Sequence, residues 1–180
     1  MIEPRQLGEN VSLRLLRPDD ASALALAYVR NRQYLVQWEP ERSEDYFTEW
    51  WQAADIASRL AAHDTGESYP FGIFAGDTLV GRFTLAGIVR GPFQSGGLGY
   101  WVDRDYAGRG LASAAVQAIV QLAREDFQMH RIEASTLLHN VGSQRVLLKA
   151  GFNLIGMAPR YLKIAGQWQD HNLYQTILHD

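Results

Sequence analysis

The stretch that most constrains the fold runs from Tyr100 to Ala112, where a strand pattern passes through a glycine-containing turn into a helical pattern. Gly108 and Gly110 can adopt positive φ angles, so several backbone N–H groups can turn toward one point. The helix that follows adds the positive end of its dipole at the same place. We therefore expect this strand, turn and helix to bind a phosphate group.

Two common nucleotide-binding motifs contain similar loops. A P-loop needs Gly-Lys followed by Ser or Thr, whereas Gly110 is followed by Leu111 and Ala112, which disfavours triphosphate hydrolysis. A dinucleotide-binding fingerprint fits better, because Gly108–Ser113 nearly matches G-x-G-x-x-G and Glu133 follows at a suitable distance. However, only 70 of the 180 residues follow Gly110, too few to complete a doubly wound fold.

The composition predicts one globular domain that spans residues 1–180. Hydrophobic residues make up 47% of the chain, which is enough for a full core. There is no apolar N-terminal segment and no run approaching eighteen apolar residues, so we expect a cytoplasmic protein that does not bind membranes. The net charge of −3, without a Lys/Arg cluster, argues against nucleic-acid binding.

The chain has no cysteine, which excludes disulfides, thiolate metal ligands and a cysteine-bound acyl intermediate. Any group transfer must then be direct or use another nucleophile. The five histidines do not have the spacing of metal ligands, and we expect no metal site.

The hydrophobic pattern predicts seven strands and about four helices. The expected strands are Val11–Arg17, Phe71–Phe74, Thr78–Gly87, Gly96–Val102, Arg131–Leu137, Leu154–Ile164 and Trp168–Leu178. Four helices are expected. The first begins at Pro18-Asp19-Asp20, with Asp19 or Asp20 as its N-cap, and the second spans Ser43 to His63. The third follows Gly110, and the fourth spans Gly142 to Ala150. The helix after Gly110 joins two strands by a crossover, which predicts one parallel pair in an otherwise antiparallel sheet.

This layout and several motifs resemble the GNAT superfamily of acetyl-coenzyme A-dependent N-acetyltransferases over nearly the whole chain. The general motifs are Ala107–Ala112, Asn140–Ser143 and Leu148–Phe152. Within the superfamily the chain is similar to the ribosomal-protein-alanine N-acetyltransferases of the RimJ/RimL group, and more to RimJ. The segments that carry this narrower likeness are Leu35–Pro40, Val89–Phe93, Leu98–Tyr100 and Tyr161–His171. The resemblance implies a mixed α+β fold whose one parallel strand pair splays apart.

The resemblance also implies that acetyl-coenzyme A is the acyl donor. Its pyrophosphate-binding turn falls on Ala107, Gly108, Arg109, Gly110, Leu111 and Ala112. Ala107 replaces the family's Gln or Arg, and because backbone N–H groups hold most of the pyrophosphate, we expect only modestly weaker binding. The pantetheine would lie in the splayed wedge and pair with backbone groups of Tyr100 and Val102, where a bulge would direct one N–H at the thioester carbonyl.

Two residues near the start of the last helix are candidates for roles at the thioester. Asn140 matches the family asparagine that hydrogen-bonds the cofactor arm near its thiol end. Ser143 matches the position of a hydroxyl that protonates the departing thiolate. Its position in the first turn of the helix equally suits an N-cap.

The general base that some members of the superfamily carry is absent here, because Tyr161-Leu162-Lys163 stands where they have a carboxylate. An N-terminal α-amine has a pKa of about 7.8 and a lysine about 10.4, so at pH 7 the free-amine fraction differs by roughly 400-fold. An α-amine therefore needs only a base acting through water, for which Glu39 and Asp170 are the candidates. Glu39 could equally be a surface charge, and Asp170 could orient backbone in a turn.

Acidic and aromatic residues cluster between positions 38 and 51. The carboxylates are Glu39, Glu41, Glu44, Asp45 and Glu49, relieved only by Arg42, and the aromatic residues are Trp38, Tyr46, Phe47, Trp50 and Trp51. We expect an acidic groove for the basic tail of a ribosomal protein, with a solvated helix face as the alternative. The candidate acceptor-binding residues are Trp38, Glu39, Arg90, Tyr161 and Asp170.

Three function classes remain open from the sequence. The first is an N-terminal protein acetyltransferase in which the amine attacks acetyl-coenzyme A directly in a ternary complex. The second is an acetyltransferase for a small amine such as an antibiotic, a polyamine or an amino acid. The third is a non-catalytic module that binds coenzyme A. The sequence also leaves open whether the protein is a monomer or a homodimer.

Overall fold

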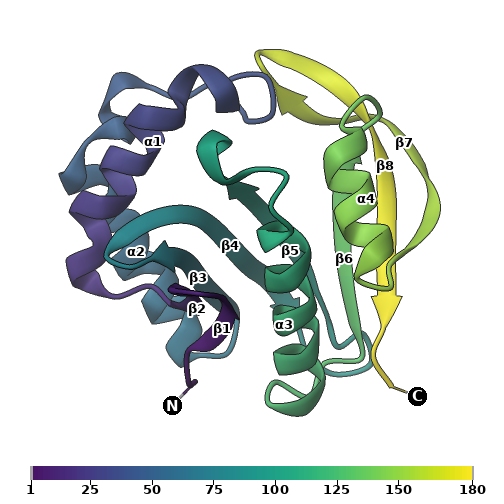
Figure 1. Cartoon of the computed structure of the whole chain (residues 1–180). Coiled ribbons are helices and arrows are strands. Elements are labelled where there is room, and N and C mark those ends of the chain that lie inside the picture. Colours follow the sequence, from purple (N-terminus) through teal and green to yellow (C-terminus); the bar gives the residue numbers. More distant parts are fainter. Residues whose placement is uncertain (1, 180) are drawn as a thin grey trace.

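Eight strands form one sheet in the order β1-β2-β3-β4-β5-β6-β8-β7 in the computed structural model, which describes residues 2–179 (Figure 1). The strands are β1 Arg5–Gly8, β2 Val11–Leu15, β3 Ser68–Ala75, β4 Thr78–Val89, β5 Ser95–Val102, β6 Arg131–Leu137, β7 Asn153–Ile164 and β8 Gln167–Ile177. The α-helices are α1 Ala21–Leu35, α2 Glu49–Asp64, α3 Leu111–Glu125 and α4 Val141–Lys149. The 3₁₀ helices are η1 Pro18–Asp20, η2 Glu44–Phe47 and η3 Arg104–Tyr106. The mixed α+β class is confirmed.

Strand β1 is the strand that the hydrophobic pattern does not predict. Its four residues pair antiparallel with β2, so that Arg5 lies opposite Leu13. The strand is short, lies at the edge of the sheet and is only partly buried, so it lacks the apolar run that marks a longer strand. The predicted count of seven strands is therefore one too low.

Two predicted helix starts differ from the structure. Thr48 has extended backbone angles and accepts a hydrogen bond from the Trp51 N–H at 3.4 Å, so it divides the expected Ser43–His63 helix into η2 and α2. Asp20 occupies the N-cap position of α1 but does not cap the helix. Its carboxylate instead accepts two hydrogen bonds from Arg14 at 2.7 Å.

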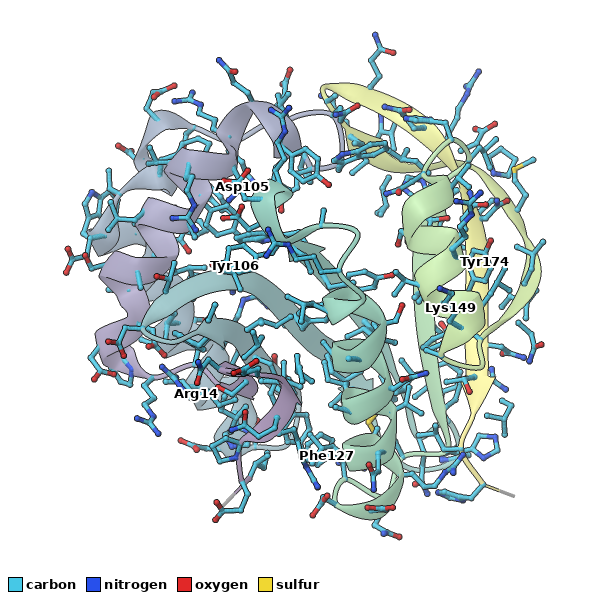
Figure 2. The ribbon with its side chains drawn as sticks, in the orientation of Figure 1. Arg14, Asp105, Tyr106, Phe127, Lys149 and Tyr174 are labelled. Atoms are coloured by element: carbon cyan, nitrogen blue, oxygen red, sulfur yellow. The ribbon has the colours of Figure 1, made fainter. Side chains whose placement is uncertain are left out.

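Each pair of helices packs over its own apolar cluster. Leu24 of α1 and Ile56 of α2 are fully buried in one cluster, and Ile119 of α3 and Leu147 of α4 are fully buried in the other. Phe127, which lies just beyond α3 (Figure 2), stacks on Tyr69 with ring centroids 3.6 Å apart. Burying each large apolar side chain stabilises the fold by about 1.5–3 kcal/mol. No helix within residues 2–179 is long and apolar enough to cross a membrane.

The parallel pair β5–β6 splays apart, as predicted. The two strands pair only where Ser95–Gly97 lies against Arg131–Glu133. Beyond this point β5 stays paired to β4 as far as Val102, and β6 stays paired to β8 as far as Leu137. The sheet consequently has two halves that diverge from a three-residue junction, and the space between them is visible in Figure 1.

Candidate active site

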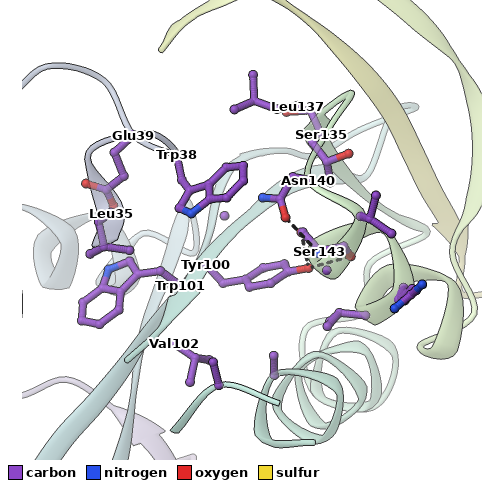
Figure 3. A pocket seen from close by; sticks show the side chains of 18 of the residues that line it. Leu35, Trp38, Glu39, Tyr100, Trp101, Val102, Ser135, Leu137, Asn140 and Ser143 are labelled. Atoms are coloured by element: carbon purple, nitrogen blue, oxygen red, sulfur yellow. Dashed lines mark hydrogen bonds between the residues drawn. The ribbon is translucent and has the colours of Figure 1, made fainter. Parts of the chain in front are cut away.

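The diverging strands open into a cavity of about 800 Å³. Its walls come from both strands, the loop after α1, the turn before α3, the first two turns of α4 and the β7–β8 hairpin. The predicted site residues that line it are Trp38, Glu39, Tyr100, Val102, Ala107, Gly108, Gly110, Leu111, Ala112, Asn140 and Ser143. Arg90, Arg109, Tyr161 and Asp170 are not among the lining residues. Figure 3 shows labelled side chains around the cavity that come from the end of α1 and the loop after it, from β5, from β6 and from the start of α4.

The turn before α3 presents backbone donors to the cavity. Gly108 and Gly110 have φ angles of +75° and +82°, a region that L side chains rarely adopt. Gly110 is the N-cap of α3 and has no side chain with which to satisfy the first N–H groups of the helix. These donors, from Leu111 onward, stay available to an anion.

Two basic side chains that the motif analysis does not single out lie beside this turn. Arg145 and Lys149, one turn apart on α4, line the same cavity. Their i, i+4 spacing next to the Asn140–Ser143 motif is the signal by which the sequence could have indicated them. Arg109 lies differently, because its guanidinium sits over the Tyr106 ring at 5.0 Å. The cationic character of this end of the cavity therefore comes from α4.

Backbone groups of β5 also face the gap. The Asp103 N–H donates to the Val80 carbonyl at 2.8 Å, and Trp101 lies opposite Arg82. Hydrogen-bonded pairs alternate along an antiparallel ladder, so the N–H and C=O of Tyr100 and Val102 point away from β4 and into the gap. The expected bulge at Tyr100 and Val102 is wrong, because the β4–β5 register is continuous there and shifts only between Ala86 and Val89.

Asn140, Ser143 and Tyr100 form a connected group on the cavity wall. Asn140 is the N-cap of α4, and its side-chain oxygen accepts a hydrogen bond from the Ser143 N–H at 3.1 Å. The capping residue is thus Asn140, which leaves the Ser143 side chain available for other contacts. The Ser143 hydroxyl lies 2.8 Å from the Tyr100 hydroxyl, as the dashed lines in Figure 3 show.

The Tyr100 ring is held by packing and stays neutral. It stacks on Phe83 with ring centroids 5.0 Å apart and an interplanar angle of 3°. Burial raises the pKa of Tyr100 to about 12, against a smaller opposing effect of the hydrogen bond with Ser143. A phenol that keeps its proton can donate to Ser143, whose own proton can then point into the cavity.

The opposite end of the cavity is closed by contacts between the α1 loop and the C-terminal half of the sheet. The Ala165 N–H in the β7–β8 turn donates to the Glu39 carbonyl at 3.0 Å. Trp38 lies against His139 with ring centroids 5.3 Å apart. Burial raises the pKa of the Glu39 carboxyl, although the charges of Arg42 and Arg82 oppose the shift.

Most of the expected acidic groove does not form. Among the five carboxylates between positions 39 and 49, only Glu39 lines the cavity, and Glu44 pairs with Arg32. Tyr46 is buried and packs on Trp51 with ring centroids 4.5 Å apart, so these aromatic residues belong to the core. Apolar packing of this segment under α1 and α2 is the physical reason for the difference.

Three predicted acceptor-binding residues have other surroundings. Arg90 donates to the Phe127 carbonyl at 2.7 Å, beyond the end of α3. Asp170 accepts from the Arg160 N–H at 2.8 Å, where Arg160 has a positive φ angle of 47°, so its carboxylate orients backbone. Tyr161 is exposed, but its ring contacts His171, which lines the cavity and which the motif analysis does not single out.

Comparison with known proteins identifies the family. Residues 10–153 match the acetyltransferase (GNAT) domain. The chain belongs to this family. It is 36% identical to a probable N-acetyltransferase, YjcK, of Bacillus subtilis (strain 168), over 92% of this chain and 93% of that protein. It is 34% identical to the ribosomal protein uS5-alanine N-acetyltransferase of Escherichia coli (strain K12), over 94% of this chain and 88% of that protein.

A solved GNAT structure matches the fold over most of the chain. It is Mycobacterium smegmatis RimJ in complex with CoA-disulfide, with a TM-score of 0.88 and 30% identity over 93% of this chain and 81% of that chain. The protein is thus a GNAT N-acetyltransferase that uses acetyl-coenzyme A. The cavity suits this molecule, because free N–H groups at α3 and cations on α4 fit its phosphates. The gap-facing groups of Tyr100 and Val102 fit an amide-containing arm.

Proposed function

We propose that this GNAT enzyme acetylates the N-terminal α-amine of a protein, with alanine as the first residue and a ribosomal protein as the acceptor. The relative from Escherichia coli, which is named for the alanine of ribosomal protein uS5, supports this choice. The observation that carries the proposal is the acceptor end of the cavity. Glu39 is the only carboxylate among the described residues that line it, and Trp38 and Leu162 supply apolar surface beside it.

This arrangement suits a single cationic group on a short apolar residue. An α-ammonium group would bind to the Glu39 carboxylate, and the alanine methyl group would contact Trp38 and Leu162. Because an α-amine has a pKa of about 7.8, a useful fraction is already free at neutral pH. A lysine side chain would need a stronger base, since its pKa is about 10.4.

The roles of the chain's own groups follow from their positions. Acetyl-coenzyme A supplies a thioester whose carbonyl carbon the amine attacks. The N–H groups of Leu111 and its neighbours and the cations of α4 hold the phosphates, and Asn140 orients the arm. Ser143, backed by Tyr100, donates a hydrogen bond to the leaving sulfur, which needs little help because a thiol has a pKa of about 8.5. Transfer is direct within a ternary complex, since the chain has no cysteine to carry the acetyl group.

The test is acetylation of synthetic peptides followed by mass spectrometry. One peptide begins with a free alanine, a second has a blocked N-terminus and an internal lysine, and a third panel contains polyamines and free amino acids. We expect acetylation of the alanine peptide at its α-amine. Preferential acetylation of the blocked lysine peptide would contradict the proposal, and preferential acetylation of the small amines would favour the small-molecule alternative.

A further inference from the structure

One polar side chain on the acceptor side of the cavity has no role in the proposed function. His171 lies on β8, opposite Leu137 of β6 and Ala158 of β7. The residue is 3% exposed, yet it lines the same cavity as Glu39 and Trp38. A buried imidazole at the wall of a catalytic cavity is a candidate proton acceptor.

The hydrogen bonding of His171 determines which ring nitrogen carries the proton. Nδ1 lies 3.0 Å from the Gln169 carbonyl oxygen. A carbonyl oxygen only accepts hydrogen bonds, so Nδ1 must donate, and the neutral ring carries its lone pair on Nε2. No hydrogen bond to Nε2 is present among residues 2–179. The contact with the Tyr161 ring, at 5.7 Å between centroids, holds the imidazole in this orientation.

His139 gives a useful contrast in the same cavity. His139 also lines the wall, but it is exposed, and its ring lies tilted against Trp38. It has no hydrogen bond that selects one tautomer among the described residues. Of the two histidines among the described residues that line the cavity, His171 is therefore the one that combines burial, a defined tautomer and an acceptor nitrogen without a hydrogen bond.

We propose that His171 is the general base, whose Nε2 takes the proton from the acceptor amine. This role rests on the proposed transfer to an α-amine. The amine nitrogen forms a bond to the carbonyl carbon while the bond from that carbon to sulfur breaks. The proton released from nitrogen passes to Nε2 and then to solvent, and the thiolate takes a proton through Ser143, which is replenished from solvent. The sum is one amide and one thiol.

The matched variants are His171→Gln and His63→Gln, compared at saturating alanine peptide. Glutamine keeps a hydrogen-bonding side chain but cannot take up a proton. We expect His171→Gln to lower kcat by about 10²–10³-fold, with the affinity for coenzyme A unchanged by calorimetry. His63→Gln, on α2 and outside the cavity lining, should keep kcat within about twofold. Added imidazole should restore part of the activity of His171→Ala, because the deleted side chain leaves space for it.

A second measurement does not depend on activity. Nitrogen NMR of the imidazole should show that neutral His171 carries its proton on Nδ1. A proton on Nε2 would overturn the proposal, as would an unchanged kcat in His171→Gln or a large loss of kcat in Glu39→Gln alone. If the wild-type enzyme acetylates no peptide α-amine, the proposed function fails, and the role of His171 fails with it. If the wild type acetylates the alanine peptide and His171→Gln is equally active, only the role of His171 fails.

Discussion

At the residue scale, the contact between Tyr100 and Ser143 determines how the leaving thiolate is stabilised. The two hydroxyls lie 2.8 Å apart, and Asn140 rather than Ser143 caps α4. The capping bond places the Ser143 main chain, and the Tyr100 phenol orders the Ser143 hydroxyl. Without the Tyr100 phenol, the Ser143 hydroxyl would be free to rotate.

Removing the hydroxyl should slow the chemical step without weakening substrate binding. We expect Ser143→Ala to lower kcat by about 10²-fold and to leave KM for the alanine peptide unchanged. Tyr100→Phe keeps the stack on Phe83 and should lower kcat less. Release of free thiol measures the rate. Ser135→Ala, which removes another hydroxyl from the cavity wall, is the control, and equal losses in Ser135→Ala and Ser143→Ala would contradict a specific role for Ser143.

Glu39 should act on peptide binding more than on turnover. We expect Glu39→Gln to raise KM for the alanine peptide about tenfold, or about 1.4 kcal/mol, with kcat within about twofold. Because burial raises the pKa of Glu39, its carboxylate becomes protonated at a higher pH than the ordinary value of about 4.3. As the solution is acidified, the KM of the wild type for the alanine peptide should therefore start to increase while the pH is still higher than about 4.3.

The matched control for Glu39 is an exposed carboxylate outside the cavity. Glu49→Gln, at the start of α2, should leave KM unchanged. In Glu39→Gln, the part of the acid dependence of KM that belongs to this carboxyl should disappear. A KM that follows pH identically in Glu39→Gln and the wild type would contradict the assignment.

At the element scale, the turn between β5 and α3 works because its glycines have positive φ angles. Nothing lies within 4 Å of a Cβ built on Gly110, so Gly110→Ala is strained only by its φ angle of +82°. We expect this variant to lose about 1–2 kcal/mol of stability and to bind coenzyme A about tenfold more weakly. Calorimetry measures both quantities. Gly156→Ala, equally uncrowded but without a positive φ, should bind normally, and unchanged binding by Gly110→Ala would contradict the phosphate site.

The same turn is fixed to α1 by a buried carboxylate. Asp103 accepts hydrogen bonds from Arg30 Nε at 2.7 Å, from Asn31 Nδ2 at 2.8 Å and from the Asp105 N–H at 2.9 Å. Burial alone would raise the pKa of Asp103, but the bonds from Asn31, Asp105 and Arg30 outweigh it and lower that pKa. Folding therefore stabilises the ionised carboxylate of Asp103 relative to its protonated form.

This network makes the stability of the protein depend on pH. We expect Asp103→Asn to lower the free energy of unfolding by about 2 kcal/mol at pH 7, which lowers Tm by about 4–8 °C. A depressed pKa stabilises the fold above the unfolded value of about 3.9, and this contribution is lost as the pH falls through the folded pKa. The difference between the two proteins should therefore shrink below about pH 4. A difference in stability between Asp103→Asn and the wild type that stayed constant as the pH fell below about 4 would contradict this assignment.

At the scale of the whole molecule, the sequence predicts what local patterns determine. The strand, glycine turn and helix from Tyr100 onward follow from local patterns, and the one parallel strand pair follows from the crossover. The splay of that pair is implied only by the resemblance to the GNAT superfamily. The missing bulge depends on the β4–β5 register, and the failure of the acidic groove depends on how Tyr46 packs. The tautomer of His171 depends on the Gln169 carbonyl. None of these features leaves a periodic signal in the chain.

The splayed sheet should become more stable and more protected when coenzyme A joins its two halves. At a ligand concentration of 100 times Kd, binding stabilises the folded state by about 2.7 kcal/mol, which should raise Tm by about 5–11 °C. Hydrogen exchange should locate the effect, because alternate amides of β5 face different neighbours. The Trp101 amide already bonds to β4 and should change little, whereas the gap-facing Tyr100 and Val102 amides should gain protection. Equal protection of all three amides would mean that the ligand stabilises the sheet as a whole and does not pair with β5.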